Sequence, residues 1–106
     1  MTDAAALLKK LPSAFQPDAA GDADCTVQFN ISKPAYIVIK AGACATKDGS
    51  ADNADVTITM EDDDLVSLMK GELNGMTAFM TGKLQLEGDL MLAQRMFGFF
   101  DSSKLG

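Results

Sequence analysis

The 106-residue sequence predicts an α+β domain in which helices cover one face of a five-stranded mixed β-sheet. Two patterns lead to this class. Segments in which apolar and polar residues alternate, as in half-buried strands, gather in the first half of the chain. Segments with apolar residues three and four positions apart, as in helices, lie at the N-terminus and in the second half. The expected order is helix, three meandering strands, a fourth strand, two helices, a fifth strand and a last helix.

An amphipathic helix opens the chain. Its apolar stripe consists of Leu7, Leu8, Leu11 and Phe15. Pro12 interrupts this stripe, and proline removes a backbone donor and clashes with the preceding helical turn. We therefore expect the helix to span about 3–10 and to be followed by a short turn and a polar connector, 17–24.

Four strands are expected next. In the first, Cys25, Val27, Phe29 and Ile31 alternate with polar residues and should face the core. The second is rich in β-branched residues and should lie inside the sheet, because such residues pack well on a pleated surface. Ala41-Gly42 forms a hairpin turn into the third, and a loop rich in Asp, Gly and Asn leads to the fourth. The expected strands are 25–31, 36–40, 43–47 and 56–60.

Helices dominate the remainder of the chain. Residues 61–64 place four carboxylates at the positive end of a helix that Gly71 ends. Asp89 is positioned to cap the last helix, which is apolar on most faces and therefore needs cover on two sides. The expected elements are helices at 61–70, 75–81 and 90–100 and a fifth strand at 84–87.

The composition excludes several classes of function. The chain is long enough for a single domain, 1–106, with one modest core. Its net charge of -6 argues against nucleic acid as a partner, because a phosphate backbone requires a basic surface. It has no histidine, which excludes Ser-His and Cys-His nucleophiles and the commonest metal ligand. We expect no catalytic residue, no metal and no cofactor, and we expect Cys25 and Cys44 to be reduced, partly buried thiols.

Neither end of the sequence fits the secretory or the peroxisomal signal pattern. The N-terminus carries Asp3 early and its lysines after the apolar residues, which is the wrong order for a secretory signal. No apolar run approaches the roughly 18 residues that span a bilayer. Ser103-Lys104-Leu105 would be a peroxisomal address only at the very C-terminus, and Gly106 follows it. We therefore expect a free-standing cytoplasmic protein.

Residues 71–96 are the most informative stretch. Four glycines divide it into short pieces, and the residues between them are nearly all apolar, with four methionines. Methionine adapts to ligands of varied shape. An apolar wall of this kind, without a catalytic side chain, suggests a site that holds an apolar molecule.

Several segments of the chain resemble one known family. They are Ala51-Asp52-Asn53-Ala54-Asp55-Val56, Gly71-Glu72-Leu73-Asn74, the sequence AFMTGKL at 78–84, and Leu92-Ala93-Gln94-Arg95. Together with 36–40 and its hairpin turn, they make roughly residues 20–100 similar to the sterol carrier protein 2 family. The stretch 71–88 is the most specific part, because its glycine spacing, Asn74 and Phe79 all agree with the family pattern.

The resemblance implies a fold, a tunnel and a function. The family has a five-stranded mixed sheet under helices, with a hydrophobic tunnel that binds fatty acids, acyl-CoA, phospholipids and sterols without catalysis. Of two tunnel glutamines in family members, one corresponds to Met76 and the other to Gln94. Lysines of the family pattern are replaced by Gln85 and Glu87, which makes acyl-CoA a poorer ligand because its phosphates favour cations.

A site and its partners follow from this resemblance. The expected lipid-binding residues are Leu65, Leu68, Met69, Met76, Phe79, Met80, Leu90, Met91, Gln94 and Phe97. The expected partner is an apolar lipid such as a fatty acid or sterol, with acyl-CoA and phospholipid as weaker candidates. We also expect transient membrane contact and a monomer or weak dimer. Release of the lipid requires the last helix to move, and Gly88 and Gly98 are placed to allow this.

Two other hypotheses remain open. The last helix could instead serve a protein interface, either in a dimer or in an accessory, lipid-presenting subunit of a lipid-metabolising enzyme. Phe97, Phe99 and Phe100 would then form an exposed patch rather than cover the tunnel. A hydrolase or isomerase is the third hypothesis, and without histidine no constellation for it is visible.

Overall fold

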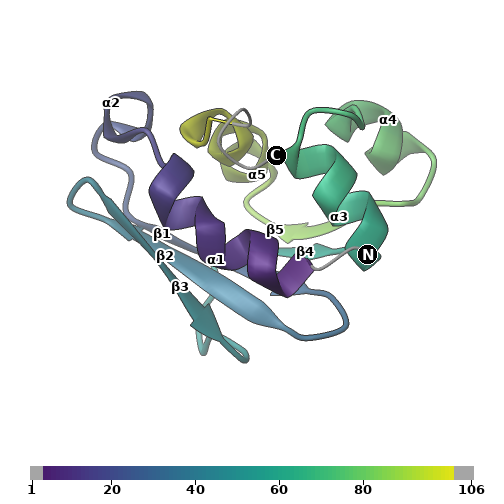
Figure 1. Cartoon of the computed structure of the whole chain (residues 1–106), viewed down its shortest axis with the longest axis horizontal. Coiled ribbons are helices and arrows are strands. Elements are labelled where there is room, and N and C mark those ends of the chain that lie inside the picture. The colour runs from purple at the N-terminus through teal and green to yellow at the C-terminus, as the bar shows by residue number, and fades with distance from the viewer. Residues whose placement is uncertain (1–3, 102–106) are drawn as a thin grey trace.

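A single mixed sheet organises the molecule (Figure 1). The computed structural model describes residues 4–101, except for the side chains of Ala5 and Phe97. The strand order is β3-β2-β1-β4-β5; β1 and β4 are parallel and the other neighbours are antiparallel. The strands are β1 (Cys25–Asn30), β2 (Ala35–Lys40), β3 (Ala43–Asp48), β4 (Val56–Thr59) and β5 (Gln85–Gly88). The predicted fold class is confirmed, and each predicted strand lies within one or two residues of its expected bounds.

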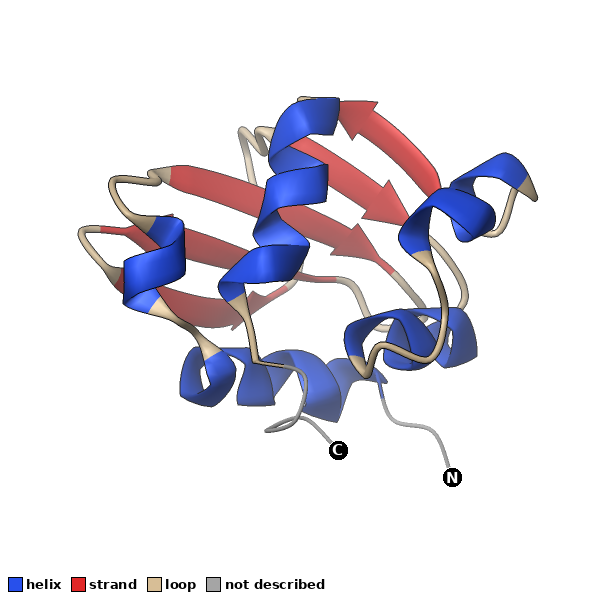
Figure 2. Cartoon of the chain, turned by 90° about the horizontal axis from the view of Figure 1, so that it is seen from above, coloured by secondary structure: helices blue, strands red, loops and turns tan. Residues whose placement is uncertain are grey.

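The helices cover one face of this sheet (Figure 2). They are α1 (Ala4–Ala14), α2 (Pro17–Ala20), α3 (Asp62–Met69), α4 (Gly75–Met80) and α5 (Leu90–Met96), followed by the 3-10 helix η1 (Phe97–Phe99). The core lies between the two layers, because alternate strand residues point toward the helices. Its largest fully buried side chains are Phe29, Leu8, Leu11, Ile37, Ile39, Ile58, Leu65, Met96, Val27 and Val56.

Pro12 does not end the first helix. The prediction of a helix over about 3–10 is wrong, since α1 continues through Pro12 to Ala14. In a regular helix the N–H at position 12 would donate to the carbonyl of Leu8. Here the hydroxyl of Thr46 on β3 donates to that carbonyl, at 2.6 Å. The side chain of a neighbouring strand therefore supplies the donor that proline lacks, and it fixes α1 across the edge of the sheet.

This contact predicts a double-mutant result. Thr46→Val should leave the partly buried Leu8 carbonyl without a donor and lower the free energy of unfolding by about 1–3 kcal/mol. Pro12→Ala restores the helical N–H, so Thr46→Val should cost clearly less in a Pro12→Ala background. Urea unfolding of the four proteins measures the coupling. Equal costs in the two backgrounds would show that the hydroxyl does not replace the missing helical donor.

The loop between β3 and β4 is fixed to the sheet by Gln28, which is only 5% exposed. Its Nε2 donates to the carbonyls of Ala35 and Gly49, at 3.2 and 3.1 Å, and its Oε1 accepts from the N–H of Ala51 at 2.7 Å. Gln28 lies on the face of β1 opposite the helices. A buried amide that uses both its donor and its acceptor therefore holds this loop against the far side of the sheet.

The start of α3 is tied to the loop after β1. The hydroxyl and the backbone N–H of Ser32 both donate to the carboxylate of Asp62. These two hydrogen bonds, from the side chain and then the backbone of Ser32, hold the pKa of Asp62 below its ordinary value. Because the folded state favours the charged carboxylate, this contribution to stability is present at neutral pH and is lost as the pH falls through the lowered pKa.

The chain end differs from the expected long last helix. Instead of continuing to residue 100, α5 ends at Met96 and passes into η1. Phe100 then forms an antiparallel bridge with Phe15, and their ring centroids are 5.7 Å apart. Phe99 and Phe100 are only 3% and 6% exposed, so neither contributes to an exposed aromatic patch. Phe97 is the third residue of that patch, and its side chain lies outside the described part of the structure.

Candidate functional site

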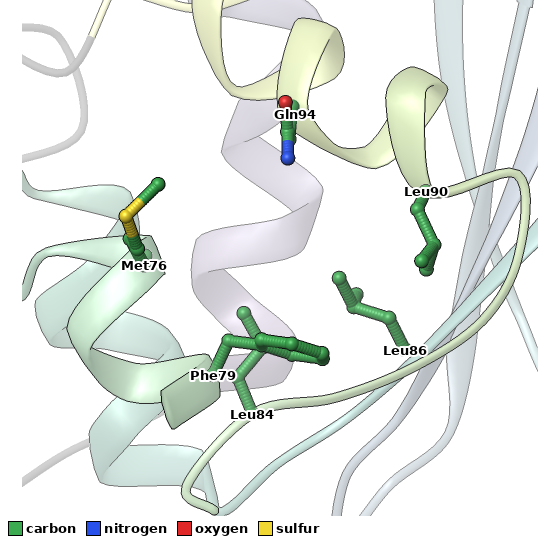
Figure 3. A pocket seen from close by; sticks show the side chains of 7 residues that line it. Met76, Phe79, Leu84, Leu86, Leu90 and Gln94 are labelled. Carbon is green, nitrogen blue, oxygen red and sulfur yellow. The ribbon is translucent and has the colours of Figure 1, made fainter. Parts of the chain in front are cut away.

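An apolar pocket of about 410 Å³ lies between α4, β5 and α5 (Figure 3). Its lining consists of Gly75, Met76, Phe79, Leu84, Leu86, Leu90 and Gln94. In Figure 3, Met76 and Phe79 project from α4, and Leu90 and Gln94 project from α5 on the other side. The pocket is partly open to solvent, since Met76 is 69% and Phe79 50% exposed.

Local sequence determines how α4 presents its side chains. Asn74 caps this helix, because its Oδ1 accepts from the N–H groups of Met76 and Thr77 at 2.8 and 3.2 Å. Met76 and Phe79 are three positions apart and therefore share one face of the helix. A Cβ atom on Gly75 would lie 3.6 Å from the side chain of Leu68, an ordinary van der Waals distance, so the start of α4 lies against α3.

The opposite wall is formed by β5 and α5. Leu86 pairs with Ile58 of β4, which places both side chains on the helix-covered face of the sheet. Asp89 caps α5 as predicted, because its Oδ1 accepts from the N–H of Leu92 at 3.0 Å. Leu90 and Gln94 are four positions apart and face the pocket together.

The lining offers apolar contact and one neutral polar group. Six of its seven residues are apolar or glycine, and the seventh is Gln94, whose amide both donates and accepts hydrogen bonds. None of the seven is charged. Among the described residues no group of three His, Cys, Asp or Glu side chains could hold a metal ion. The pocket is therefore suited to an uncharged, apolar molecule or part of one.

The two thiols lie outside this lining. Both are free, as expected, with Cys25 buried and Cys44 half-buried. Burial raises the pKa of Cys44 to about 11, and burial also raises the pKa of Cys25. Both thiols therefore stay protonated at neutral pH, a state in which they are poor nucleophiles.

The ten residues expected in the site separate into four groups. Met76, Phe79, Leu90 and Gln94 line the pocket. Leu65, Leu68 and Met69 are buried on α3 and belong to the core. Met80 and Met91 are 78% and 74% exposed and are not among the lining residues. Phe97 has a side chain outside the described part of the structure.

Three lining residues were missing from that expectation. The alternation Leu84-Gln85-Leu86 predicts two leucines on one face of a strand, so it contained the signal for Leu84 and Leu86. Gly75 lines the pocket through its backbone, and a residue without a side chain gives no such signal.

Fold and site together define a small α+β domain in which helices cover one face of the sheet and an apolar pocket lies between α4, β5 and α5. The chain belongs to the SCP-2 sterol transfer family, whose profile matches residues 5–101. It is 43% identical over 58 residues to sterol carrier protein 2 of Bos taurus, an alignment that covers 55% of this chain and 11% of the relative. The chain thus spans about a tenth of the length of that relative.

Two solved structures share the fold. Sterol carrier protein 2 like 2 of Aedes aegypti superposes with a TM-score of 0.72 at 22% identity, covering 90% of this chain and 91% of that one. An inverting sec-alkylsulfatase from Pseudomonas sp. gives a TM-score of 0.80 at 24% identity, covering 86% of this chain but 15% of the enzyme. At these identities the similarity establishes the architecture alone. No helix in the described range, 4–101, is long and apolar enough to cross a membrane.

Proposed function

We propose that this chain, as a single domain, binds and transfers an apolar lipid and does not catalyse a reaction. The observation that carries the proposal is the pocket between α4, β5 and α5, with its uncharged lining and its one amide. Membership in a sterol transfer family supports the same function. The described lining supplies no acid, base or nucleophile for a reaction at a bound molecule.

The size of the pocket is compatible with this function. Ligand sites are typically about 300–1,000 Å³ and mostly apolar, and a pocket of about 410 Å³ lies near the lower limit of that range. Each lipid methylene removed from water contributes about 0.8 kcal/mol, so a single acyl chain gains affinity without much polar help. A fatty acid, a sterol or a related lipid with one apolar body is therefore the proposed ligand. Acyl-CoA is a poorer candidate, because none of the lining residues is a cation that would face its phosphates.

The proposed lipid contacts come from all three walls. They are Met76, Phe79, Leu84, Leu86, Leu90 and Gln94. Of the expected residues on α3, Leu68 has a different proposed role. Its side chain lies close to Gly75 and supports the start of α4. Gln94 is the proposed partner of a hydroxyl, ester or carboxyl group on the lipid, since its amide is the one strong hydrogen-bonding side chain among the lining residues.

Native mass spectrometry and fluorescence test the proposal. Protein purified without detergent should carry a lipid-sized mass or, after delipidation, should take up a fluorescent fatty acid with saturable, one-to-one binding. Palmitate should compete, since the Aedes aegypti protein with this fold was solved in a palmitated form. Absence of both copurified lipid and probe uptake in a folded sample would contradict lipid binding.

A further inference from the structure

The single Asn-Gly pair of the chain, Asn74-Gly75, lies where α4 begins beside the pocket. Asn74 is exposed, and Gly75 is part of the pocket lining. The other two asparagines, Asn30 and Asn53, precede residues with side chains. A glycine has the widest backbone freedom and no side chain in the way, so its nitrogen reaches the amide carbon of a preceding asparagine most easily. Asn74 is therefore the asparagine most open to attack by its own backbone.

The backbone nitrogen of Gly75 is not engaged elsewhere. The first N–H groups of a helix have no acceptor within it, and Oδ1 of Asn74 serves only the two that follow Gly75. No residue in the described part of the structure accepts a hydrogen bond from the N–H of Gly75. In the comparable pair Asp48-Gly49, the N–H of Gly49 instead donates to the carbonyl of Pro34 at 2.9 Å. The nitrogen beside Asn74 thus has no bond to break before it reacts.

The start of α4 protects Asn74 while it stays closed. The ψ angle of Asn74 is 126°, which turns the nitrogen of Gly75 away from the side-chain amide, and the two capping hydrogen bonds hold that amide in place. The reaction therefore requires the first turn of α4 to open. Opening costs little, because α4 has six residues, of which Ala78 alone is buried, and so short a helix is marginal by itself.

A molecule in the pocket opposes this opening. Gly75 and Met76 both belong to the lining, so a bound lipid contacts the first turn of α4 directly (Figure 3). We propose that Asn74 is a site of spontaneous deamidation and that occupancy of the pocket sets its rate. The link to occupancy rests on the proposed function, whereas the modification itself does not. The state of Asn74 then records how long the pocket has been without a lipid.

The reaction consumes only water. The nitrogen of Gly75 attacks Cγ of Asn74, the bond from Cγ to Nδ2 breaks, and ammonia leaves with the proton of the attacking nitrogen. The product is a cyclic succinimide, which water opens at either of its two carbonyls. Opening at Cγ gives aspartate, which caps a helix as well as asparagine does. Opening at the main-chain carbonyl gives isoaspartate, whose chain runs through Cβ and no longer fits the start of α4.

Peptide mapping measures the reaction in the full-length protein. The delipidated protein is incubated in mildly alkaline buffer, digested with trypsin and analysed by mass spectrometry. Cleavage after Lys70 and Lys83 yields the peptide 71–83, whose sole asparagine is Asn74, and Asn53 is the sole asparagine of the peptide 48–70. Deamidation should accumulate at Asn74 and lag well behind at Asn53, which is also exposed but precedes an alanine.

Palmitate should slow the conversion. A ligand that binds only the closed form lowers the population of the open form, so palmitate at about ten times its Kd should slow deamidation of Asn74 about tenfold. The rate at Asn53, which does not line the pocket, should not change. Leu90→Glu is the matched control. At the same palmitate concentration this variant should lose most of the protection, because Leu90 lines the pocket.

Gly75→Ala separates the chemistry from the helix. A Cβ atom at this position makes ordinary contact with Leu68, and the φ angle of Gly75 is not positive, so α4 should persist. Conversion of Asn74 should slow about fivefold, because alanine restricts the backbone at the attacking nitrogen. In urea-unfolded protein the difference between alanine and glycine should remain. The wild type should convert faster there than in the native state, and palmitate should have no effect.

Three outcomes would overturn the proposal. They are conversion at Asn74 no faster than at Asn53, equal rates at Asn74 in the native and unfolded wild type, and an unchanged rate at Asn74 in protein shown by fluorescence competition to hold palmitate. Failure of the proposed function has a different signature, namely a wild type that binds no palmitate. That result removes the link to occupancy, while faster conversion at Asn74 than at Asn53, slowed by Gly75→Ala, still supports the modification site.

Discussion

Replacing Gly88 by alanine is expected to lower the free energy of unfolding by about 4 kcal/mol or more. A Cβ atom at this position would lie 2.4 Å from the carbonyl oxygen of Asp55 and 3.1 Å from the Cα atom of Val56, and neither backbone atom can move aside easily. The φ angle of Gly88 is +100°, which an alanine rarely adopts. The same carbonyl of Asp55 accepts the N–H of Asp89 at 2.9 Å, so the start of α5 would shift as well.

Gly82→Ala is the matched control for this substitution. Gly82 also has a positive φ, +82°, but a Cβ atom there would meet nothing within 4 Å. The substitution Gly82→Ala should therefore lower the free energy of unfolding only by the backbone strain, about 1–2 kcal/mol. Thermal and urea unfolding of both variants separate the two effects. Similar losses at the two positions would show that the close approach of β5 to β4 is not what requires a glycine at 88.

Replacing Leu90 by glutamate is expected to weaken lipid binding by about 2–3 kcal/mol, which is roughly 30- to 150-fold. Leu90 lines the pocket, so the variant loses apolar contact and places a charge beside the lipid chain. The fold should tolerate the change, because Leu90 is 45% exposed and begins α5, where a carboxylate favours the helix dipole. Titration with a fluorescent fatty acid measures the loss.

Met91→Glu controls for the added charge. Met91 occupies the same first turn of α5 but is not among the residues that line the pocket. Its affinity for the lipid in solution should stay within about twofold of the wild type. Equal losses in both glutamate variants would indicate a general effect of negative charge on α5. An unchanged affinity in Leu90→Glu would place the lipid elsewhere.

The strands were predictable because their signal is local. Alternation in 25–31 and 56–60 identifies which residues face the core, and Val27, Phe29, Val56 and Ile58 are indeed fully buried. The strand order is also constrained by sequence, since a two-residue turn at Ala41-Gly42 permits only an antiparallel pair. Contacts of this kind depend on neighbours in the chain, which a single sequence displays.

Two features depended on partners far away in the chain. Pro12 predicted a helix end, and the donor that allows α1 to continue comes from Thr46, on a strand that follows much later. Phe99 and Phe100 suggested an exposed patch or a tunnel cover, and Phe100 instead packs on Phe15 near the other end of the chain. No periodicity reports such pairings, so local rules alone did not predict the helix continuing past Pro12 or the burial of Phe99 and Phe100.

The candidate site was partly predictable for a related reason. Helical spacing identifies the apolar face of α3 and of α4, but it does not say whether that face meets the sheet or a cavity. Leu65 and Phe79 both lie on the apolar face of a helix in the sequence pattern. Leu65 is nevertheless fully buried in the core, whereas Phe79 lines the pocket. The glycine at 88 was equally ambiguous. It suggested a hinge, which stays a prediction, and the structure adds a second reason for a glycine, namely the close approach of position 88 to the backbone of Asp55 and Val56.

Photolabelling tests the central claim most directly. A fatty acid with a diazirine on its acyl chain is bound to the wild-type protein and activated, and the labelled residues are located by peptide mass spectrometry. We predict label on residues 75–94, on the side chains that line the pocket, and its loss in Leu90→Glu but not in Met91→Glu. Label concentrated on α1 or on the open face of the sheet, unchanged by Leu90→Glu, would contradict a lipid site between α4, β5 and α5.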